Sequence, residues 1–390
     1  MSPSADHLGS TQATSTGNLD IHLWPDPGPD LNLDLRPGAG KVKDIWVIDN
    51  HFKHVFTTVT LGFIGTILCS VGTVGNIINV AVFCRMGFKE TINISFLGLA
   101  VADIGCLLTQ LWLNVMYIPA FRDLADWLLP FDPADPTFRN VTAAWPHICF
   151  SRITGLVTAY ATLVRCLCIA MPLQVKTMLT PGRSLAVIVS IFLSMFAVVS
   201  PVFFASPLGW KYSPSRNRTL YMQLGVDNEV EQITYGLSNV CGYVAFFVVI
   251  LCTSILITSL RRKARWREGA TSAGAAGKDS DDPTGNKPGS GSVSKETKII
   301  KLVVIISAVF IGSYFPSTVV FLAATAMPGF SATGKYNNLF FMACSLTYNM
   351  EAINSSVNIF IYLNMSSKYR ATFDSMLCRA DSSSMVAAKD

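Results

Sequence analysis

The sequence predicts an all-α membrane protein built as a bundle of seven membrane-spanning helices. Of its 390 residues, 51% are hydrophobic and only 14% are charged, whereas soluble domains carry about 25% charged residues. Seven apolar runs each reach the ~20 residues that a helix needs to cross a bilayer. Lys and Arg gather on alternate connections between these runs. Such a composition excludes collagen-like, disordered, disulfide-rich secreted and nucleic-acid-binding proteins.

The seven apolar runs are expected to be helices, because lipid leaves the backbone of a single strand without hydrogen-bond partners. No repeat of 20–50 residues is visible, so one bundle over 56–364 is predicted. We place its spans near 57–84, 92–118, 145–170, 184–208, 233–260, 299–327 and 336–363.

Three polar segments flank or interrupt the bundle. Residues 1–55 are acidic and rich in Pro and Gly, without the apolar core of a signal peptide, and predict a disordered N-terminal tail. Residues 261–298 are rich in Gly, Ser, Lys and Asp, which predicts a flexible third cytoplasmic loop. Residues 365–390 form the C-terminal segment.

The placement of basic residues predicts the orientation of the chain. One side of the bundle carries 19 of the 30 Lys and Arg residues, five of them within 261–267. Because basic residues favour the cytoplasmic side, we expect an extracellular N-terminus and an intracellular C-terminus. Sequons at Asn140 and Asn217 then fall in outer loops, where glycosylation is expected. The ten cysteines avoid those loops, so reduced cysteines and no outer disulfide are predicted.

A few charged residues interrupt the predicted spans: Asp103, Arg152, Arg165 and Glu351. Charges at such depth are costly and mark function by default. Polar residues also share one face of two spans. The third span carries His147, Ser151, Thr154, Thr158, Thr162 and Arg165, and the seventh carries Tyr348, Glu351, Asn354, Ser355, Asn358 and Tyr362. Alternatively, these polar side chains could have only a structural role, as hydrogen bonds between helices. This interpretation explains the Ser and Thr residues well but the charged residues poorly.

Over residues 55–380 the chain resembles the rhodopsin-like (class A) G protein-coupled receptors. The end of the third span also resembles molluscan chemosensory receptors and, more loosely, invertebrate neuropeptide receptors. Five motifs in order carry the resemblance: Gly75-Asn76, Leu99-Ala-Val-Ala-Asp103, Arg165-Cys-Leu-Cys-Ile-Ala-Met-Pro-Leu173, Phe310-Ile-Gly-Ser-Tyr-Phe-Pro316 and Asn354-Ser-Ser-Val-Asn-Ile-Phe-Ile-Tyr362.

The chain departs from the family pattern at several positions. Val164 replaces the acid before Arg165, and Tyr314 replaces the Trp of the sixth span. Ile359 replaces Pro, and Asn140 stands where the family places the cysteine of its outer disulfide. These departures bear on activation more than on the fold.

The resemblance implies a plasma-membrane receptor that binds an extracellular ligand in the outer half of the bundle. Its inner half would then open to a heterotrimeric G protein. The implied ligand pocket comprises His147, Ser151, Arg152, Tyr314, Ser317, Thr318, Tyr348 and Glu351. Arg152 is expected either to pair with Glu351 or to anchor a carboxylate of the ligand.

The resemblance also implies a sodium site, for which a polar network without an ion is the alternative. Its oxygen-bearing residues would be Asp103, Thr154, Asn354, Ser355 and Asn358. The implied coupling residues are Arg165, Glu296, Pro172, Leu173, Asn358 and Tyr362, with Glu296 as the acid that restrains Arg165. A short amphipathic eighth helix is expected at 368–373, and lipidation at Cys378.

Other functions have less support. No metal-ligand spacing, phosphate-binding glycine loop or Ser/His/Asp arrangement suggests an enzyme. A transporter or channel is the alternative function, although such proteins usually show internal repeats or broken helices. Expected partners are membrane lipid, a G protein and an extracellular ligand. Whether that ligand is a small chemosensory molecule or a neuropeptide stays open.

Overall fold

The computed structural model describes residues 48–387 except 172–173, 176–178, 215, 226, 276–289 and 333. The side chains of 263–264, 266–275, 290–296 and 379–387 are also outside the description. Most of the predicted N-terminal tail, Pro172, Leu173 and the side chain of Glu296 therefore lie outside the described residues.

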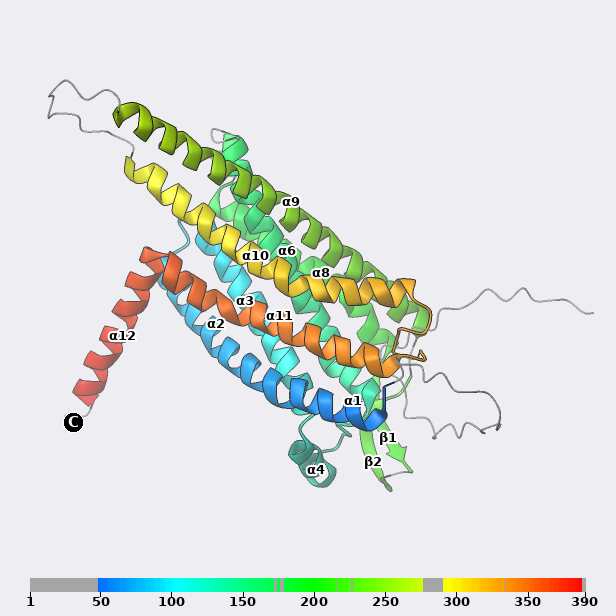
Figure 1. Cartoon of the computed structure of the whole chain (residues 1–390). Helices are drawn as coiled ribbons and strands as arrows, with labels where there is room; N and C mark the ends of the chain where they lie inside the picture. The colour runs from blue at the N-terminus through cyan, green and yellow to red at the C-terminus, as the bar shows by residue number, and fades with distance from the viewer. Residues whose placement is uncertain are drawn as a thin grey trace, which may run out of the picture.

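Long helices dominate the described part of the chain and run side by side as a bundle (Figure 1). The first begins as α1 (Asn50–Thr57), passes through the π-helical η1 (Thr58–Gly65) and continues as α2. Its main part is α2 (Thr66–Met86). The other long helices of the bundle are α3 (Thr91–Val115), α6 (Trp145–Ala170), α8 (Pro181–Ala205), α9 (Asn228–Ala275), α10 (Ser290–Ala326) and α11 (Asn337–Met365).

Six segments in the described part are long and apolar enough to cross a membrane. They are Asn50–Met86, Thr91–Val115, Pro136–Ala170, Pro181–Ala205, Asn228–Arg262 and Thr297–Ala326. The seventh predicted span, 336–363, coincides with α11 but is not among them. Its 29 residues are enough to span, but its buried face carries Asn, Ser, Thr and Glu side chains that lower its mean hydropathy.

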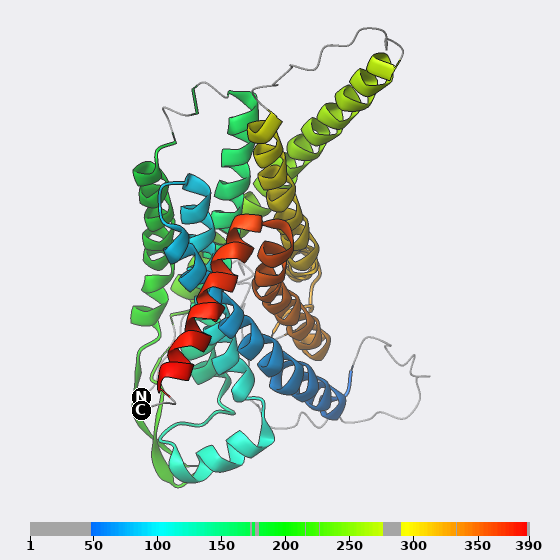
Figure 2. The same cartoon turned by 90° about the vertical axis from the view of Figure 1, so that its left-hand side faces the viewer.

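The sequence predicts one end of the bundle to be extracellular; we call it the outer end, and the opposite end the inner end. The connections at the outer end contain structure that the all-α expectation did not include. A hairpin pairs β1 (Leu208–Ser213) with β2 (Arg218–Gln223) in antiparallel register, with Trp210 opposite Tyr221. Its turn contains Asn217 at φ 49°, a conformation that Asn tolerates better than most residues. The hairpin and α4 (Pro119–Leu128) lie at one end of the bundle, and α9 projects from the other (Figure 2).

Two contacts tie the hairpin to the first outer connection. The backbone N–H of Tyr221 donates to the carbonyl of Pro130 over 2.6 Å. Arg216 pairs with Asp126 at 2.6 Å and with Asp132 at 3.2 Å. Hydrogen bonding to Asp126 raises the pKa of Arg216 further, so the guanidinium stays charged. These contacts hold the two outer connections together without a disulfide.

At the inner end, aromatic rings close the core around Tyr362. Its ring lies 5.1 Å from that of Phe83, 5.0 Å from that of Phe96 and 5.4 Å from that of Tyr369. Tyr369 belongs to α12 (Ser367–Ala387), which turns away from α11 (Figure 1), and its hydroxyl donates to Asn79 over 2.6 Å. α12 starts one residue before the expected eighth helix and extends well beyond Phe373, where that expectation ended.

Candidate functional site

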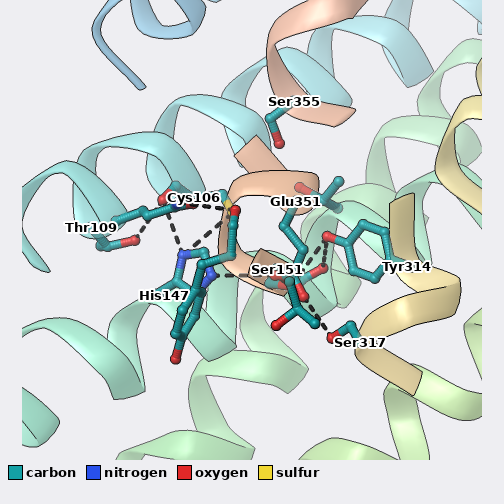
Figure 3. Close-up of polar contacts among 12 residues, drawn as sticks. Cys106, Thr109, His147, Ser151, Tyr314, Ser317, Glu351 and Ser355 are labelled. Atoms are coloured by element: carbon teal, nitrogen blue, oxygen red, sulfur yellow. Dashed lines mark hydrogen bonds and ion pairs between the residues drawn. The ribbon is translucent and has the colours of Figure 1, made fainter. Parts of the chain in front are cut away.

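A buried carboxylate joins three helices in the middle of the bundle (Figure 3). Glu351 of α11 is only 5% exposed. One of its carboxylate oxygens accepts from the hydroxyl of Ser317 on α10 over 2.9 Å. The other accepts from Ser151 on α6 over 2.8 Å and lies 3.2 Å from His147 Nε2, also on α6. The predicted pocket residues His147, Ser151, Ser317 and Glu351 therefore meet.

His147 extends this network to α3. Because a carboxylate oxygen only accepts, Nε2 carries the hydrogen that faces Glu351. Nδ1 lies 3.2 Å from the carbonyl oxygen of Cys106 and 3.6 Å from its thiol. One of these groups accepts a hydrogen bond and the other can donate one, so the imidazole has a partner with or without a proton on Nδ1. The ring also meets Tyr348 edge-on, with centroids 4.8 Å apart.

Tyr314 connects the network to the aromatic core below it. Its hydroxyl lies 3.1 Å from the Ser151 hydroxyl and donates to the Ser151 carbonyl over 3.3 Å. Its ring stacks on Phe310 with centroids 4.3 Å apart. Tyr314, which stands where the class A pattern has Trp, thus links the buried carboxylate to α10 through a hydroxyl that an indole does not have. The hydroxyl of Thr318, by contrast, donates a hydrogen bond only within its own helix, to the carbonyl of Tyr314.

Arg152 does not pair with Glu351, contrary to one of the two expectations from the sequence. Its Nη2 donates to Asn239 Oδ1 on α9 over 3.0 Å. Consecutive residues on a helix point about 100° apart, so Arg152 faces α9 because its neighbour Ser151 faces α10 and α11. Asn239 was not predicted, since an isolated Asn in an apolar run carries no distinguishing pattern.

A small cavity lies on the outer side of this network. Its volume is about 30 Å³, enough for about one water molecule. Its lining is largely apolar and aromatic, and a larger ligand could enter only if some of these side chains moved. The lining residues are Ala144, Ile148, Tyr235, Phe321, Phe340, Phe341, Cys344 and Tyr348.

A second buried carboxylate, Asp103 on α3, gathers four of the five residues predicted for a sodium site. Oδ1 accepts from Thr154 over 3.1 Å and from Ser355 over 2.9 Å, and Oδ2 accepts from Asn358 over 2.8 Å. The fifth, Asn354, is buried on α11 but makes none of these bonds. One carboxylate with hydroxyl and amide oxygens suits a hard cation.

The inner end of the bundle has two adjoining clefts. One, of about 560 Å³, is lined by Arg165, Val164 and Cys168 of α6 together with residues near Lys89 and Leu179. The other, of about 410 Å³, is lined by Tyr362 and Tyr369 among others. Glu90, Ile92 and Ile299 border both. Because the side chain of Glu296 lies outside the described residues, its pairing with Arg165 stays a prediction.

The two predicted glycosylation sites differ in the structure. Asn140, in η2 (Asn140–Ala144), is 5% exposed, and its amide donates to Glu231 Oε1 over 2.7 Å. The same oxygen accepts from Trp145 Nε1 over 3.0 Å. A buried, hydrogen-bonded amide does not suit glycan attachment, whereas Asn217 is exposed in the hairpin turn. Glu231 was not predicted, because its position next to an outer loop resembles that of an ordinary exposed acid.

All ten cysteines lie among the described residues and none of them forms a disulfide there. Asn140 stands where the class A pattern has its disulfide cysteine, and its contact with Glu231 joins the segment before α6 to the start of α9. Cys378, predicted to be lipidated, is exposed on α12.

Comparison with known protein families identifies a family that this chain matches. A family model described as serpentine type 7TM GPCR chemoreceptor Srw matches residues 63–380, well over half of the chain. The matched region runs from the first predicted span through most of α12. No curated protein matches the chain.

Proposed function

Because the chain belongs to the Srw family of seven-transmembrane G protein-coupled chemoreceptors, we propose that it is a rhodopsin-like plasma-membrane receptor for an extracellular chemical signal. The ligand binds in the outer half of the bundle, and the inner half activates a heterotrimeric G protein. The family is one of receptors and not of enzymes. It also argues against the transporter or channel alternative.

The observation that carries the proposal is the carboxylate of Glu351, held by Ser317 of α10 and by His147 and Ser151 of α6. Leaving a buried charge without its hydrogen-bond partners costs several kcal/mol, and the partners of Glu351 lie on other helices. A ligand that moves one of these partners therefore changes the relative free energies of the different helix arrangements. The ligand enters by the cavity next to this network, and some of the side chains that line the cavity move to admit it. Its small size favours a small molecule over a neuropeptide.

The inner clefts are the proposed G protein site. Arg165 lines the larger cleft, and Tyr362 lines the smaller one. Val164 offers Arg165 no local carboxylate, so in this proposal Glu296 restrains Arg165 in the inactive receptor. Pro172 and Leu173, which follow α6 in the sequence, are proposed as further coupling residues. Asn358 contacts Asp103 one turn before Tyr362, which relates the polar core to this end of α11.

A sodium ion is proposed at Asp103, with Thr154, Ser355 and Asn358 as its neighbours and Asn354 close by on α11. When bound, the ion would supply positive charge that stabilises the ionised carboxylate. The residues themselves hold Asp103 between α3, α6 and α11 through three hydrogen bonds. In this proposal, a rearrangement of the three hydrogen bonds of Asp103 transmits ligand binding in the outer pocket to the inner end of the bundle.

The orientation follows from the two ends of the bundle. The hairpin with its exposed sequon at Asn217 and the α4 segment share one end (Figure 2). Arg261 and Arg262 belong to the C-terminal part of α9, and α9 projects from the opposite end of the bundle (Figure 2). We place the first end outside the cell and the second in the cytoplasm. Cys378 on α12 would then meet the inner leaflet as a lipidation site.

The experiment that tests the proposed function measures ligand-independent second-messenger levels in cells that express the full-length chain. Glu296→Ala should raise them, because Arg165 loses its restraint, and Arg165→Ala should reduce them to the level of untransfected cells. Glu229→Ala, an exposed acid on the outer side, is the matched control. Equal signalling in wild type, Glu296→Ala and Arg165→Ala, at equal surface expression, would contradict the proposal.

A further inference from the structure

Arg152 is a buried cation with a neutral partner. Arg152 is only 9% exposed, and its guanidinium donates one hydrogen bond, to the amide oxygen of Asn239. Within the described part of the chain, no carboxylate lies within ion-pair distance of it and its Nε has no hydrogen-bond partner. A buried charge without a counter-ion is strongly unfavourable, which points to an anion that is supplied from outside the chain.

Gly242 makes room for this guanidinium on α9. A Cβ at position 242 would lie 3.0 Å from Cδ, Nε and Nη1 of Arg152. The guanidinium therefore rests against the backbone of α9, with a buried Nε that has no hydrogen-bond partner among the described residues. Nε–H together with an Nη–H forms the planar fork that binds a carboxylate through two parallel hydrogen bonds.

Tyr235 connects Arg152 to the outer cavity. Its side chain lies beside that of Asn239, one helical turn further along α9. Its ring lines the cavity with Phe321 and Tyr348. Tyr235 therefore separates this apolar cavity from Asn239 and from the guanidinium that Asn239 binds.

We propose that the ligand is a small carboxylate with an apolar body. Its anionic end binds Arg152 beside Asn239, and its body lies among Tyr235, Phe321 and Tyr348. This inference rests on the proposed receptor function and adds the chemical class of its ligand. Glu351 does not compete for Arg152, because His147, Ser151 and Ser317 already surround it.

The depth of Arg152 favours a small molecule over a lipid headgroup as the source of the anion. Arg152 lies seven residues beyond Trp145, where α6 begins, and therefore about 10 Å deeper along the helix. The segments α5 (Pro136–Arg139) and η2 extend the same helical path further outward. A lipid phosphate at the outer surface would have to leave the headgroup region to reach the guanidinium.

The test measures the melting temperature of the purified full-length receptor with matched probes. Benzoate and hexanoate are the carboxylates, and benzamide and hexanamide are neutral molecules of the same shape. A ligand that binds only the folded protein raises the melting temperature as its concentration rises. The two carboxylates should do so and the two amides should not. Arg152→Gln should abolish the effect, and Arg152→Lys should weaken carboxylate binding roughly tenfold to a hundredfold.

Two glycine variants test the same geometry without changing any charge. Gly242→Ala should weaken carboxylate binding, because its methyl group displaces the guanidinium. Gly236→Ala is the matched control on the same helix, since a Cβ there meets nothing within 4 Å. Equal carboxylate binding in these two variants contradicts the proposed geometry even if Arg152→Gln does not fold.

The remaining outcomes overturn the inference but not the receptor function. Equal shifts from amides and carboxylates, or no shift from either carboxylate up to its solubility limit, would exclude an anion site at Arg152. A shift produced by phosphatidic acid alone, and lost in Arg152→Gln, would assign the site to lipid. Second-messenger levels without ligand, measured in cells, test the receptor function separately and do not depend on Arg152 binding a carboxylate.

Discussion

His147 Nε2 lies 3.2 Å from a carboxylate oxygen of Glu351 in the interior of the bundle, where the two residues are 1% and 5% exposed. The contact joins α6 to α11 across 204 positions of sequence. Ser151 and Ser317 complete the coordination of the same carboxylate. The partners of Glu351 therefore lie on α6 and α10, whereas Glu351 lies on α11. A movement of any of these three helices relative to the others changes the hydrogen bonds of the carboxylate.

Removing Glu351 should destabilise the receptor. Glu351→Ala leaves His147, Ser151 and Ser317 without their shared acceptor, and breaking a buried pair in this way costs about 3–5 kcal/mol. The melting temperature of the detergent-purified protein should fall accordingly. Glu229→Ala removes an exposed acid and should change stability by less than about 0.5 kcal/mol. Equal melting temperatures for the two variants would show that the network contributes no stability.

Sodium should stabilise the receptor through Asp103. Replacing NaCl by choline chloride at equal ionic strength should lower the melting temperature of the wild type, because the oxygen donors around Asp103 lose their cation. Asp103→Asn should have the same melting temperature in both salts. Thr109→Val is a suitable control, since Thr109 only bonds the backbone of its own helix. A sodium effect that persists in Asp103→Asn would place the ion elsewhere.

The contact of Asn140 and Trp145 with Glu231 should hold the outer end of α6 in place of a disulfide. Glu231→Ala leaves two buried donors unsatisfied, which costs about 1–3 kcal/mol for each group. Hydrogen exchange over 137–145 should therefore be faster in this variant than in wild type, while exchange around Tyr362 stays unchanged. Glu229→Ala serves again as the control. Unchanged exchange over 137–145 in Glu231→Ala would rule out this role.

Of the two outer sequons, only Asn217 should carry a glycan. Its side chain is exposed in the hairpin turn, whereas the Asn140 amide is buried against Glu231. Glycosidase treatment should reduce the mass of the wild type and of Asn140→Gln, and it should leave Asn217→Gln unchanged. A mass change in Asn217→Gln that disappears in the double variant would show that Asn140 is accessible during synthesis.

The sequence predicted much of this architecture because lipid imposes long apolar helices. The polar stripes of α6 and α11 also predicted that five residues would face the interior: His147, Ser151, Glu351, Ser355 and Asn358. Periodicity gives the angle between residues on one helix, but it does not give the rotation of a helix relative to its neighbours. For that reason the sequence could not decide that Arg152 faces Asn239 and Gly242 rather than Glu351.

The outer hairpin and Glu231 were missed for a different reason. Strands of six residues in a mixed loop carry little periodic signal, and Pro214 to Asn217 can form a turn in many contexts. Glu231 belongs to an acidic segment whose other members are exposed. Its burial depends on Asn140 and Trp145, which lie far away in sequence, so no local pattern could reveal it.

Nucleotide exchange on purified G protein α subunits tests the central claim most directly. The full-length receptor, reconstituted in lipid, is mixed with a panel of α subunits from each major class, and the uptake of a non-hydrolysable GTP analogue is followed. The account predicts exchange above that of empty vesicles for at least one class, more in Glu296→Ala, and none above background in Arg165→Ala. Exchange equal to that of empty vesicles for every class, in wild type and Glu296→Ala alike, would contradict it.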